Sequence, residues 1–417
     1  MQVRRFHFIA LALTGGAAVA LAGPALSQAA GATTTARYTI DAGTVSGMGA
    51  MGAGGGGVGA ILGAMRGGAA SAMHELRLHL GSGTSPAGAP QADHFMPAAA
   101  GLGASVPLVT PRATPSGPAT PGEMPQAQMP RGRLLLFWGC GEHAPAGQPV
   151  VIDFSKMAAG QVPPGLFASG PNLPEDWQVT QSNSRTYGEW PNDRDHKTVP
   201  ANGSLLGAHR IAGNYSPEIA FNLADDFMPA LQLGSQNMPS GAVMLNWNAL
   251  PKATGYYAWV MGGQTDGSGQ ARDMVWWTSS ATQAFGGAMT DWLSPAAVAR
   301  LVAAKNVMPP TQTTCAVPAE VKQAGGEMLM TQLYAYGPQA DFSYPPRPAR
   351  AAANWKPDWI ARVRFRANTM TMLGMPSMSG GFGDDEAGEE PQQAPQSALP
   401  KCRGLKGIAM RAAGLCQ

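Results

Sequence analysis

The sequence predicts a mainly β protein: two antiparallel β-sandwich-like units with long Gly- and Pro-rich disordered segments and one short helix. Short apolar or alternating segments recur with turn residues between them, a pattern typical of antiparallel sandwiches. Glycine and proline account for 54 and 36 of the 417 residues, a share just under that of low-complexity chains. Only 13% of the residues are charged, too few for a coiled coil or for disorder driven by charge.

Residues 1–29 have the features of a secretory signal peptide. Arg4 and Arg5 form a basic region, residues 8–21 an apolar region, and small residues around Ser27 a cleavage site. The apolar region is shorter than the ~20 residues that span a bilayer. The sequence therefore predicts export to the periplasm or the cell surface, with no transmembrane span after the signal is removed.

The charge of the exported part is balanced. Removing the signal takes away two basic side chains and no acid, so 26 basic side chains (28 − 2) remain against 26 acidic ones. A nucleic-acid partner usually requires a basic surface, and none is therefore expected. Residues 347–366 are a local exception, with six basic side chains and one acid.

The first folded unit is expected over residues 73–233, after a Gly/Ala-rich linker over residues 30–72. The glycine run in that linker forms neither helix nor strand at ordinary entropic cost. Residues 75–80 alternate polar and apolar side chains, the period of a half-buried strand. A Pro-rich insertion without periodicity follows at 81–130. Further strands are predicted at 133–138, 148–153, 177–180, 204–211 and 218–223.

The second unit is expected over residues 239–375. A helix is predicted at 294–304, where Ser294 suits the N-cap and Pro295 the first helical position. The tail, residues 376–417, is acidic and then basic, and we expect it to be disordered. Strands are predicted at 242–247, 256–261, 273–278, 313–317, 327–336 and 360–367.

One passage of the second unit resembles a known family. An apolar strand ends at Trp247, and a short loop through Pro251 and Gly255 leads to an aromatic strand at 256–261. This order resembles the passage between the B and C strands of fibronectin type III domains, over about residues 241–262. The resemblance implies an antiparallel sandwich for this unit and implies no activity, because one fold hosts many functions.

Four cysteines lie in the part predicted to be exported, where disulfides persist. Four cysteines allow three pairings. We favour Cys140 with Cys315, because both adjoin predicted strands, and Cys402 with Cys416 as a small loop in the tail. The other two pairings remain open.

Tryptophan and arginine side chains are the candidate contact residues. Arg362, Arg364 and Arg366 alternate along a predicted strand and should share one face. Trp276 and Trp277 are adjacent, so one should face the core and the other solvent or a partner. An outward Trp beside the three arginines would suit a sugar ring or an anionic polymer, although the core also accounts for tryptophans.

Two clusters could bind a metal ion. Cys140 and His143 lie together in a Gly-rich turn, and a thiolate and an imidazole bind zinc or copper. Four methionines offer soft thioethers suited to Cu(I): Met370, Met372, Met375 and Met378. A disulfide half-cystine and core-filling methionines are the alternative explanations.

Three further motifs have a spacing that does not fit their chemistry. Residues 52–57 match a dinucleotide fingerprint in letters, but no strand leads into them. His74 and His79 are five residues apart, whereas the histidines of zinc proteases are four apart on one helical face. Residues 192–196 alternate carboxylates but lack the glycine and distal glutamate of an EF-hand.

The leading hypothesis is an exported, non-enzymatic binding or structural protein without a cofactor. No Gly-x-Ser-x-Gly elbow occurs, and the expected partner is a protein or polysaccharide of the cell envelope. An exported protein that handles copper or zinc is the alternative. An envelope hydrolase with a triad assembled from distant loops is a third hypothesis.

Overall fold

The computed structural model describes residues 36–53, 72–112, 132–158, 178–265, 271–326, 329–351 and 355–373. All of these belong to one compact unit within Met1–Met378. The predicted signal, most of the predicted linker and all of the predicted tail lie outside the described residues, as do Cys402, Cys416, Met375 and Met378. The described part is mainly β, which confirms the predicted fold class.

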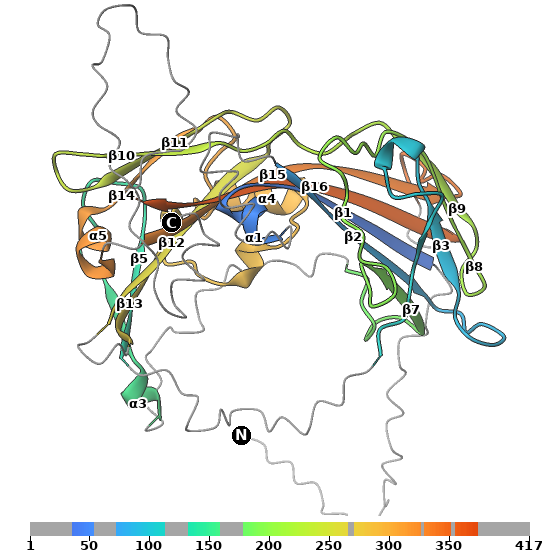
Figure 1. Cartoon of the computed structure of the whole chain (residues 1–417), viewed down its shortest axis with the longest axis horizontal. Coiled ribbons are helices and arrows are strands. Elements are labelled where there is room, and N and C mark those ends of the chain that lie inside the picture. The colour runs from blue at the N-terminus through green and yellow to red at the C-terminus, as the bar shows by residue number, and fades with distance from the viewer. Residues whose placement is uncertain are drawn as a thin grey trace, which may run out of the picture. The chain divides into compact units, whose positions relative to one another are not determined.

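A sheet of nine strands forms the centre of this unit (Figure 1). Neighbouring strands are antiparallel except for two parallel pairs, β5 with β13 and β1 with β16. The order across the sheet is β6 (Val150–Asp153), β5 (Arg133–Trp138), β13 (Ala271–Thr278), β12 (Gly255–Thr265), β15 (Leu329–Tyr344), β16 (Trp359–Leu373), β1 (Ala36–Gly47), β2 (Met73–Ser82) and β7 (Thr186–Trp190).

Two smaller antiparallel sheets pack on one face of the large sheet. The first is β10 (Leu233–Asn237), β11 (Val243–Trp247) and β14 (Thr314–Val317); the second is β4 (Val106–Pro107), β3 (Ala92–Phe95), β8 (Gly207–Gly213) and β9 (Ile219–Leu223). One apolar core joins all three sheets, since Leu245 and Ile211 belong to the same buried cluster as Ile40 and Val260.

Side chains alternate between the two faces of the large sheet, as the pleat requires. We call the face that carries Ile40, Leu78 and Val363 the core face, and it packs against the small sheets. We call the opposite face, which carries Asp41 and Arg364, the site face.

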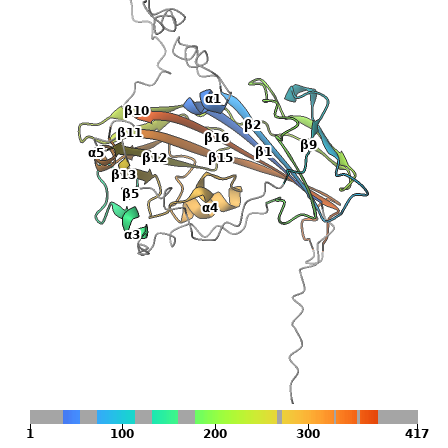
Figure 2. The same ribbon diagram turned by 60° about the horizontal axis from the view of Figure 1, so that its bottom comes forward.

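Helix α4 (Pro295–Ala303) covers part of the site face, on the other side from the small sheets (Figure 2). Ser294 caps it by accepting a hydrogen bond from the Ala297 amide, and Pro295 stands at the first turn, which confirms the predicted helix. Its Val298 packs with Tyr336 and Tyr257. The other helical elements are α1 (Met48–Ala53), α3 (Phe154–Ala158), α5 (Ala319–Gly325) and the 3₁₀ turns Ala98–Ala100 and Gly287–Thr290.

Strand β1 corrects the prediction of a linker over residues 30–72. Its composition is rich in small residues, but Tyr38, Ile40 and Ala42 alternate onto the core face and are fully buried. The strand pairs with β16 on one side and β2 on the other, so its backbone groups find partners on both sides. The local composition does not favour a strand, and hydrogen bonds to strands distant in sequence stabilise it instead.

The large sheet takes strands from both of the predicted units. Strands β2, β5, β6 and β7 come from residues 73–233, and β12, β13, β15 and β16 from residues 239–375. The predicted boundary at 233–239 therefore does not separate two sheets. Within the predicted loop 81–130, residues 92–95 and 106–107 form the short strands β3 and β4.

The predicted pairing of Cys140 with Cys315 is confirmed. The two sulfur atoms are bonded at 2.12 Å, and the Cα atoms lie 5.1 Å apart. The bond joins the turn after β5 to β14, and so connects the large sheet to the three-stranded sheet.

Within the described ranges, no helix combines the length and the apolar character needed to cross a membrane.

Candidate functional site

The arginines of β16 share one face, as predicted, but that face is not an open contact surface. Arg364 is 4% exposed. It donates to both carboxylate oxygens of Asp41, at 2.7 and 2.9 Å, and to the carbonyl of Trp292 at 2.7 Å. Asp41 stands directly beside Arg364 in the parallel register of β1 and β16. The hydrogen bonds of this guanidinium are therefore made inside the protein.

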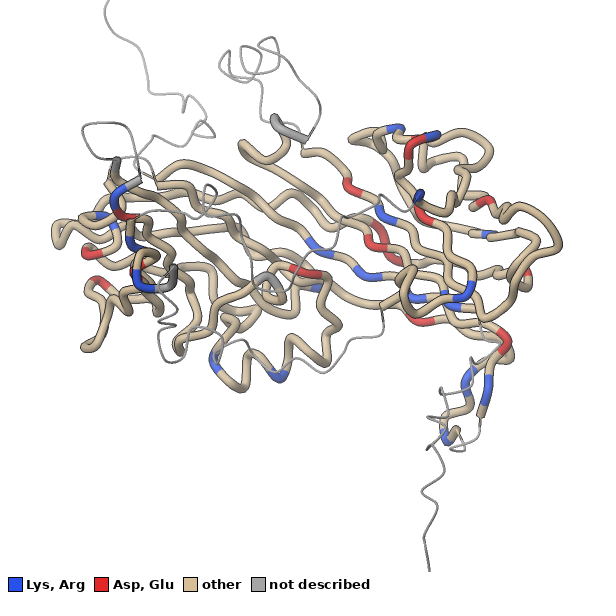
Figure 3. The backbone as a smooth tube through the Cα atoms, turned by 90° about the horizontal axis from the view of Figure 1, so that it is seen from below, with Lys and Arg blue, Asp and Glu red and all other residues tan. Residues whose placement is uncertain are grey.

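The two flanking arginines are also paired. Arg366 donates to Glu75 at 3.2 Å and to the Thr290 carbonyl at 2.6 Å, and its guanidinium lies 4.0 Å from the ring centre of Trp292. Arg362 donates to Asp341 at 2.8 Å. Figure 3 shows basic and acidic positions close together along these strands. The stripe differs from the predicted surface because distant strands and loops bring acids and carbonyls onto it.

The paired tryptophans point to opposite faces of β13, as predicted. Trp277 is buried on the core face and donates to the Gly139 carbonyl at 2.9 Å. Trp276 is half-buried, with its ring centre 5.2 Å from that of Phe285. Strands β12 and β15 lie between β13 and β16, so Trp276 does not adjoin the arginines. The aromatic ring that contacts Arg366 is Trp292 instead.

The candidate metal ligands do not converge in the described structure. Cys140 is oxidised and offers no thiolate, while His143 is exposed and contacts Glu320 at 3.1 Å. Met370 and Met372 are half-buried on β16. Three strands separate β16 from β5, whose end carries Cys140. Among the described residues, no group of three or more His, Cys, Asp and Glu side chains is arranged to hold a metal ion.

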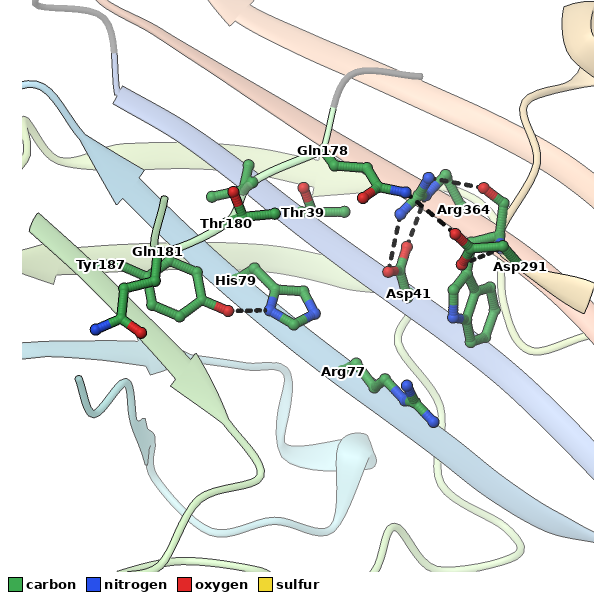
Figure 4. A pocket seen from close by; sticks show the side chains of 12 residues that line it. Thr39, Asp41, Arg77, His79, Gln178, Thr180, Gln181, Tyr187, Asp291 and Arg364 are labelled. Atoms are coloured by element: carbon green, nitrogen blue, oxygen red, sulfur yellow. Dashed lines mark hydrogen bonds and ion pairs between the residues drawn. The ribbon is translucent and has the colours of Figure 1, made fainter. Parts of the chain in front are cut away.

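A polar pocket of about 220 Å³ lies on the site face, where β1, β2, β7 and β16 run side by side (Figure 4). Its floor is the ion pair of Asp41 with Arg364, and two segments from elsewhere in the chain form its walls. The strand residues that line it are Thr39, Asp41, Arg77, His79, Tyr187 and Arg364; the walls are residues 178–181 and 291–292.

Two glycines let the walls approach the sheet. A Cβ atom on Gly81 of β2 would lie 2.2 Å from Ser184 Oγ and 2.7 Å from Val179 Cγ1. A Cβ atom on Gly43 of β1 would lie 2.9 Å from the indole of Trp292. Since side chains do not come that close without a shift, glycine at both positions allows these neighbours to lie directly against the sheet.

A chain of hydrogen bonds fixes the orientation of His79. Its Nδ1 lies 2.7 Å from the Tyr187 hydroxyl, which lies 2.7 Å from Glu189 Oε2. An ionised carboxylate only accepts, so the phenol donates to Glu189, and its oxygen accepts from Nδ1–H of His79. The neutral imidazole therefore carries its proton on Nδ1 and presents a lone pair at Nε2. The described residues make no hydrogen bond to Nε2.

Burial sets the protonation states of this chain. It lowers the pKa of His79, and Arg364 and Arg77 act in the same direction, while Glu189 opposes them. Burial, followed by the hydrogen bond and charge of Glu189, raises the pKa of Tyr187 far above its ordinary range. At neutral pH the imidazole is therefore uncharged and the phenol protonated.

The sequence predicted the strand that carries His79, but it did not predict the pocket that this side chain lines. Glu75, Arg77 and His79 alternate on one face of the predicted strand 75–80, and this alternation is the signal that could have grouped them. Their partners Tyr187 and Asp41 come from strands paired through long-range register, which the local sequence does not record.

Comparison of this chain with protein-family models, with curated proteins and with solved structures finds no match to any of them.

Proposed function

We propose that this protein is an exported, non-enzymatic binding protein whose ligand site is the pocket on the site face. The observation that carries the proposal is that polar side chains from four neighbouring strands, most of them buried or half-buried, line one concave site on a sheet whose other face is apolar core. Convergent polar groups in a concave site are what fix the orientation of a ligand and give specificity.

The charges of the lining favour a neutral ligand. Asp41 and Asp291 stand against Arg77 and Arg364, and His79 is uncharged, so the pocket has no excess of either sign. Donors and acceptors are mixed, which suits the hydroxyl groups of a sugar better than a single anion or cation.

The size of the pocket favours one ring or one end group. Its 220 Å³ lies below the roughly 300–1,000 Å³ of sites for drug-sized ligands. A single sugar residue, such as the end of an envelope polysaccharide, fits both this volume and the predicted export. Trp292 also lines the pocket, with its indole almost fully buried under the Arg366 guanidinium.

The test uses methyl glycosides of glucose, galactose, mannose and N-acetylglucosamine as probes, with saturation-transfer NMR to detect binding to the wild-type chain. Arg77→Ala removes a donor from the pocket, and we expect it to weaken the best glycoside about tenfold or more, as loss of a charged hydrogen bond does. Arg210→Ala is the matched control. Arg77 and Arg210 are both exposed and paired with a glutamate, Arg210 with Glu218 at 3.0 Å, but Arg210 lies on β8, away from the pocket.

We expect Arg210→Ala to bind the glycoside as the wild type does. If none of the four glycosides binds the wild type, or if both variants weaken binding equally, the pocket is not a sugar site and the proposal fails.

A further inference from the structure

A buried hydroxyl without a partner lies in the lining of the pocket. Thr39 is 1% exposed, and its Oγ1 has no hydrogen-bond partner within the described part of the chain. Of the buried polar atoms that lack a partner there, Thr39 Oγ1 is the one whose residue lines the pocket. A buried hydroxyl without a partner lowers stability, and such an atom therefore requires an explanation.

Another polar atom in the lining without a partner among the described residues is Nε2 of His79. Thr39 and His79 stand directly opposite each other in the antiparallel register of β1 and β2. Side chains in such a cross-strand pair have Cβ atoms about 4.5–5.5 Å apart. The pocket therefore offers two neighbouring hydrogen-bonding atoms, a hydroxyl that donates or accepts and an imidazole nitrogen that accepts.

We infer that Thr39 and His79 form a diol-recognition pair, which binds two adjacent hydroxyl groups of the ligand. One ligand hydroxyl donates to Nε2 of His79, and its neighbour bonds to Oγ1 of Thr39. This inference rests on the proposed function and makes it more specific, because it names vicinal hydroxyls, the groups that sugars and other polyols carry, as what the site recognises.

The chain through Tyr187 and Glu189 favours a hydroxyl over an anion as the ligand group at Nε2 of His79. A carboxylate or phosphate without a proton has acceptors only, and the lone pair that His79 presents at Nε2 gives it nothing to bind. The ligand group at this position therefore has to donate. Asp41 leaves no free guanidinium at the floor for an anion, because it already holds Arg364 in a bidentate pair.

The central experiment compares two isosteric substitutions on β1. Thr39→Val removes the hydroxyl in the pocket, whereas Thr44→Val removes a hydroxyl on the core face that donates to the Met228 carbonyl at 2.6 Å. We expect Thr39→Val to weaken binding of the best methyl glycoside at least tenfold, with a melting temperature equal to the wild type or higher. We expect Thr44→Val to lower the melting temperature and to keep the affinity.

Monodeoxy derivatives of the same glycoside test the ligand side of the pair. We expect the loss of either of two adjacent hydroxyls to weaken binding at least tenfold, and the loss of the others to have little effect. Long-range ¹H–¹⁵N NMR of the imidazole should show His79 protonated at Nδ1 in the free protein.

The outcomes separate this inference from the proposed function. A glycoside that binds wild type and Thr39→Val equally, a Thr39→Val variant that melts lower than the wild type, or a His79 ring protonated at Nε2 would each overturn the diol-recognition pair while the pocket remains a sugar site. Failure of every glycoside to bind the wild type would overturn the proposed function and this inference with it.

Discussion

Two hydrogen-bond chains built on histidine lie on opposite faces of the large sheet, and they differ in how they end. On the core face, the Tyr38 hydroxyl lies 2.7 Å from Nδ1 of His94, whose Nε2 lies 3.0 Å from Nδ1 of His209. Nε2 of His209 lies 2.7 Å from the Leu205 carbonyl. Since a carbonyl only accepts, each ring has one possible tautomer, and the chain runs from Tyr38 to Leu205 with every nitrogen used.

The site-face chain has the same construction with an acceptor-only group at one end, but its other end is unpaired. Glu189 orders Tyr187 and His79, and Nε2 of His79 then faces the pocket without a partner. The closed chain connects β1 to β3 and β8 of the four-stranded sheet. The fully paired chain connects two packed sheets, whereas the chain with a free lone pair is the one that the proposed function assigns to a ligand.

The largest expected difference is in stability. We expect His94→Leu to lower the free energy of unfolding by roughly 2–6 kcal/mol, because Tyr38 and His209 are both left buried without a partner at about 1–3 kcal/mol each. His79→Leu should lower it by only about 1 kcal/mol, because Tyr187 still donates to Glu189. Urea unfolding of the two variants measures both values.

His79→Leu should also lose glycoside binding, while His94→Leu keeps it when measured under conditions where the variant is folded. Equal losses of stability in the two variants would contradict the division into a closed packing chain and an open ligand chain.

The second difference concerns pH. Burial lowers the pKa of His94 well below its ordinary value, helped by the neighbouring His209, and burial also lowers the pKa of His209. In the unfolded state both rings titrate near 6.5, so below that pH the unfolded state binds more protons than the folded state. The stability is therefore fully present above about pH 6.5 and falls as the pH drops below it.

The slope should reach up to about 1.4 kcal/mol per pH unit for each histidine that stays neutral in the folded state. Unfolding free energies between pH 7.5 and 5 measure it. The pKa of His79 is also lowered, so it adds to the wild-type slope and remains in a His94→Leu variant. We expect that variant to have a flatter slope than the wild type; identical slopes would show that the closed chain does not control the pH dependence.

Local signals account for what the sequence could predict. The cap at Ser294 predicted α4, the alternation at 75–80 predicted β2, and cysteines beside strands predicted the bond between Cys140 and Cys315. The cap and the alternation come from residues that are close in sequence. The disulfide follows from the chemistry of cysteine, which the sequence shows without the fold. The fibronectin type III resemblance, export, the binding of an envelope polymer and the metal-handling and hydrolase alternatives stay predictions.

Long-range register accounts for what the sequence could not predict. Asp41 and Arg364 are 323 residues apart and meet because β1 pairs in parallel with β16. The predicted arginine stripe had the right alternation, but Trp292 and Glu75 cover and pair it from distant segments. For the same reason His79 could be considered only together with its sequence neighbour His74, whereas its partner in the fold is Tyr187.

The smallest expected effect comes from a substitution of Gly43, beside the wall of the pocket that His79 lines. In Gly43→Ala the new methyl group would lie 2.9 Å from the Trp292 indole, and the ring has to move. We expect a loss of about 1 kcal/mol in stability, the low end for overpacking, since a ring beside a pocket has room to shift. Gly141→Ala, whose nearest contact would be the His143 carbonyl at 3.3 Å, is the control; it should lose less stability than Gly43→Ala and keep the affinity, because it does not line the pocket.

Glycoside titration and thermal unfolding of the two glycine variants measure this. Gly43→Ala should weaken the best glycoside several-fold, because Trp292 lines the pocket and its carbonyl accepts from Arg364. The closed chain, on the other face of β1, should be unaffected, so the dependence of stability on pH should match the wild type. If Gly43→Ala changed that pH dependence instead of the glycoside affinity, the two faces of β1 would be coupled, and the two histidine chains could not be assigned separate roles.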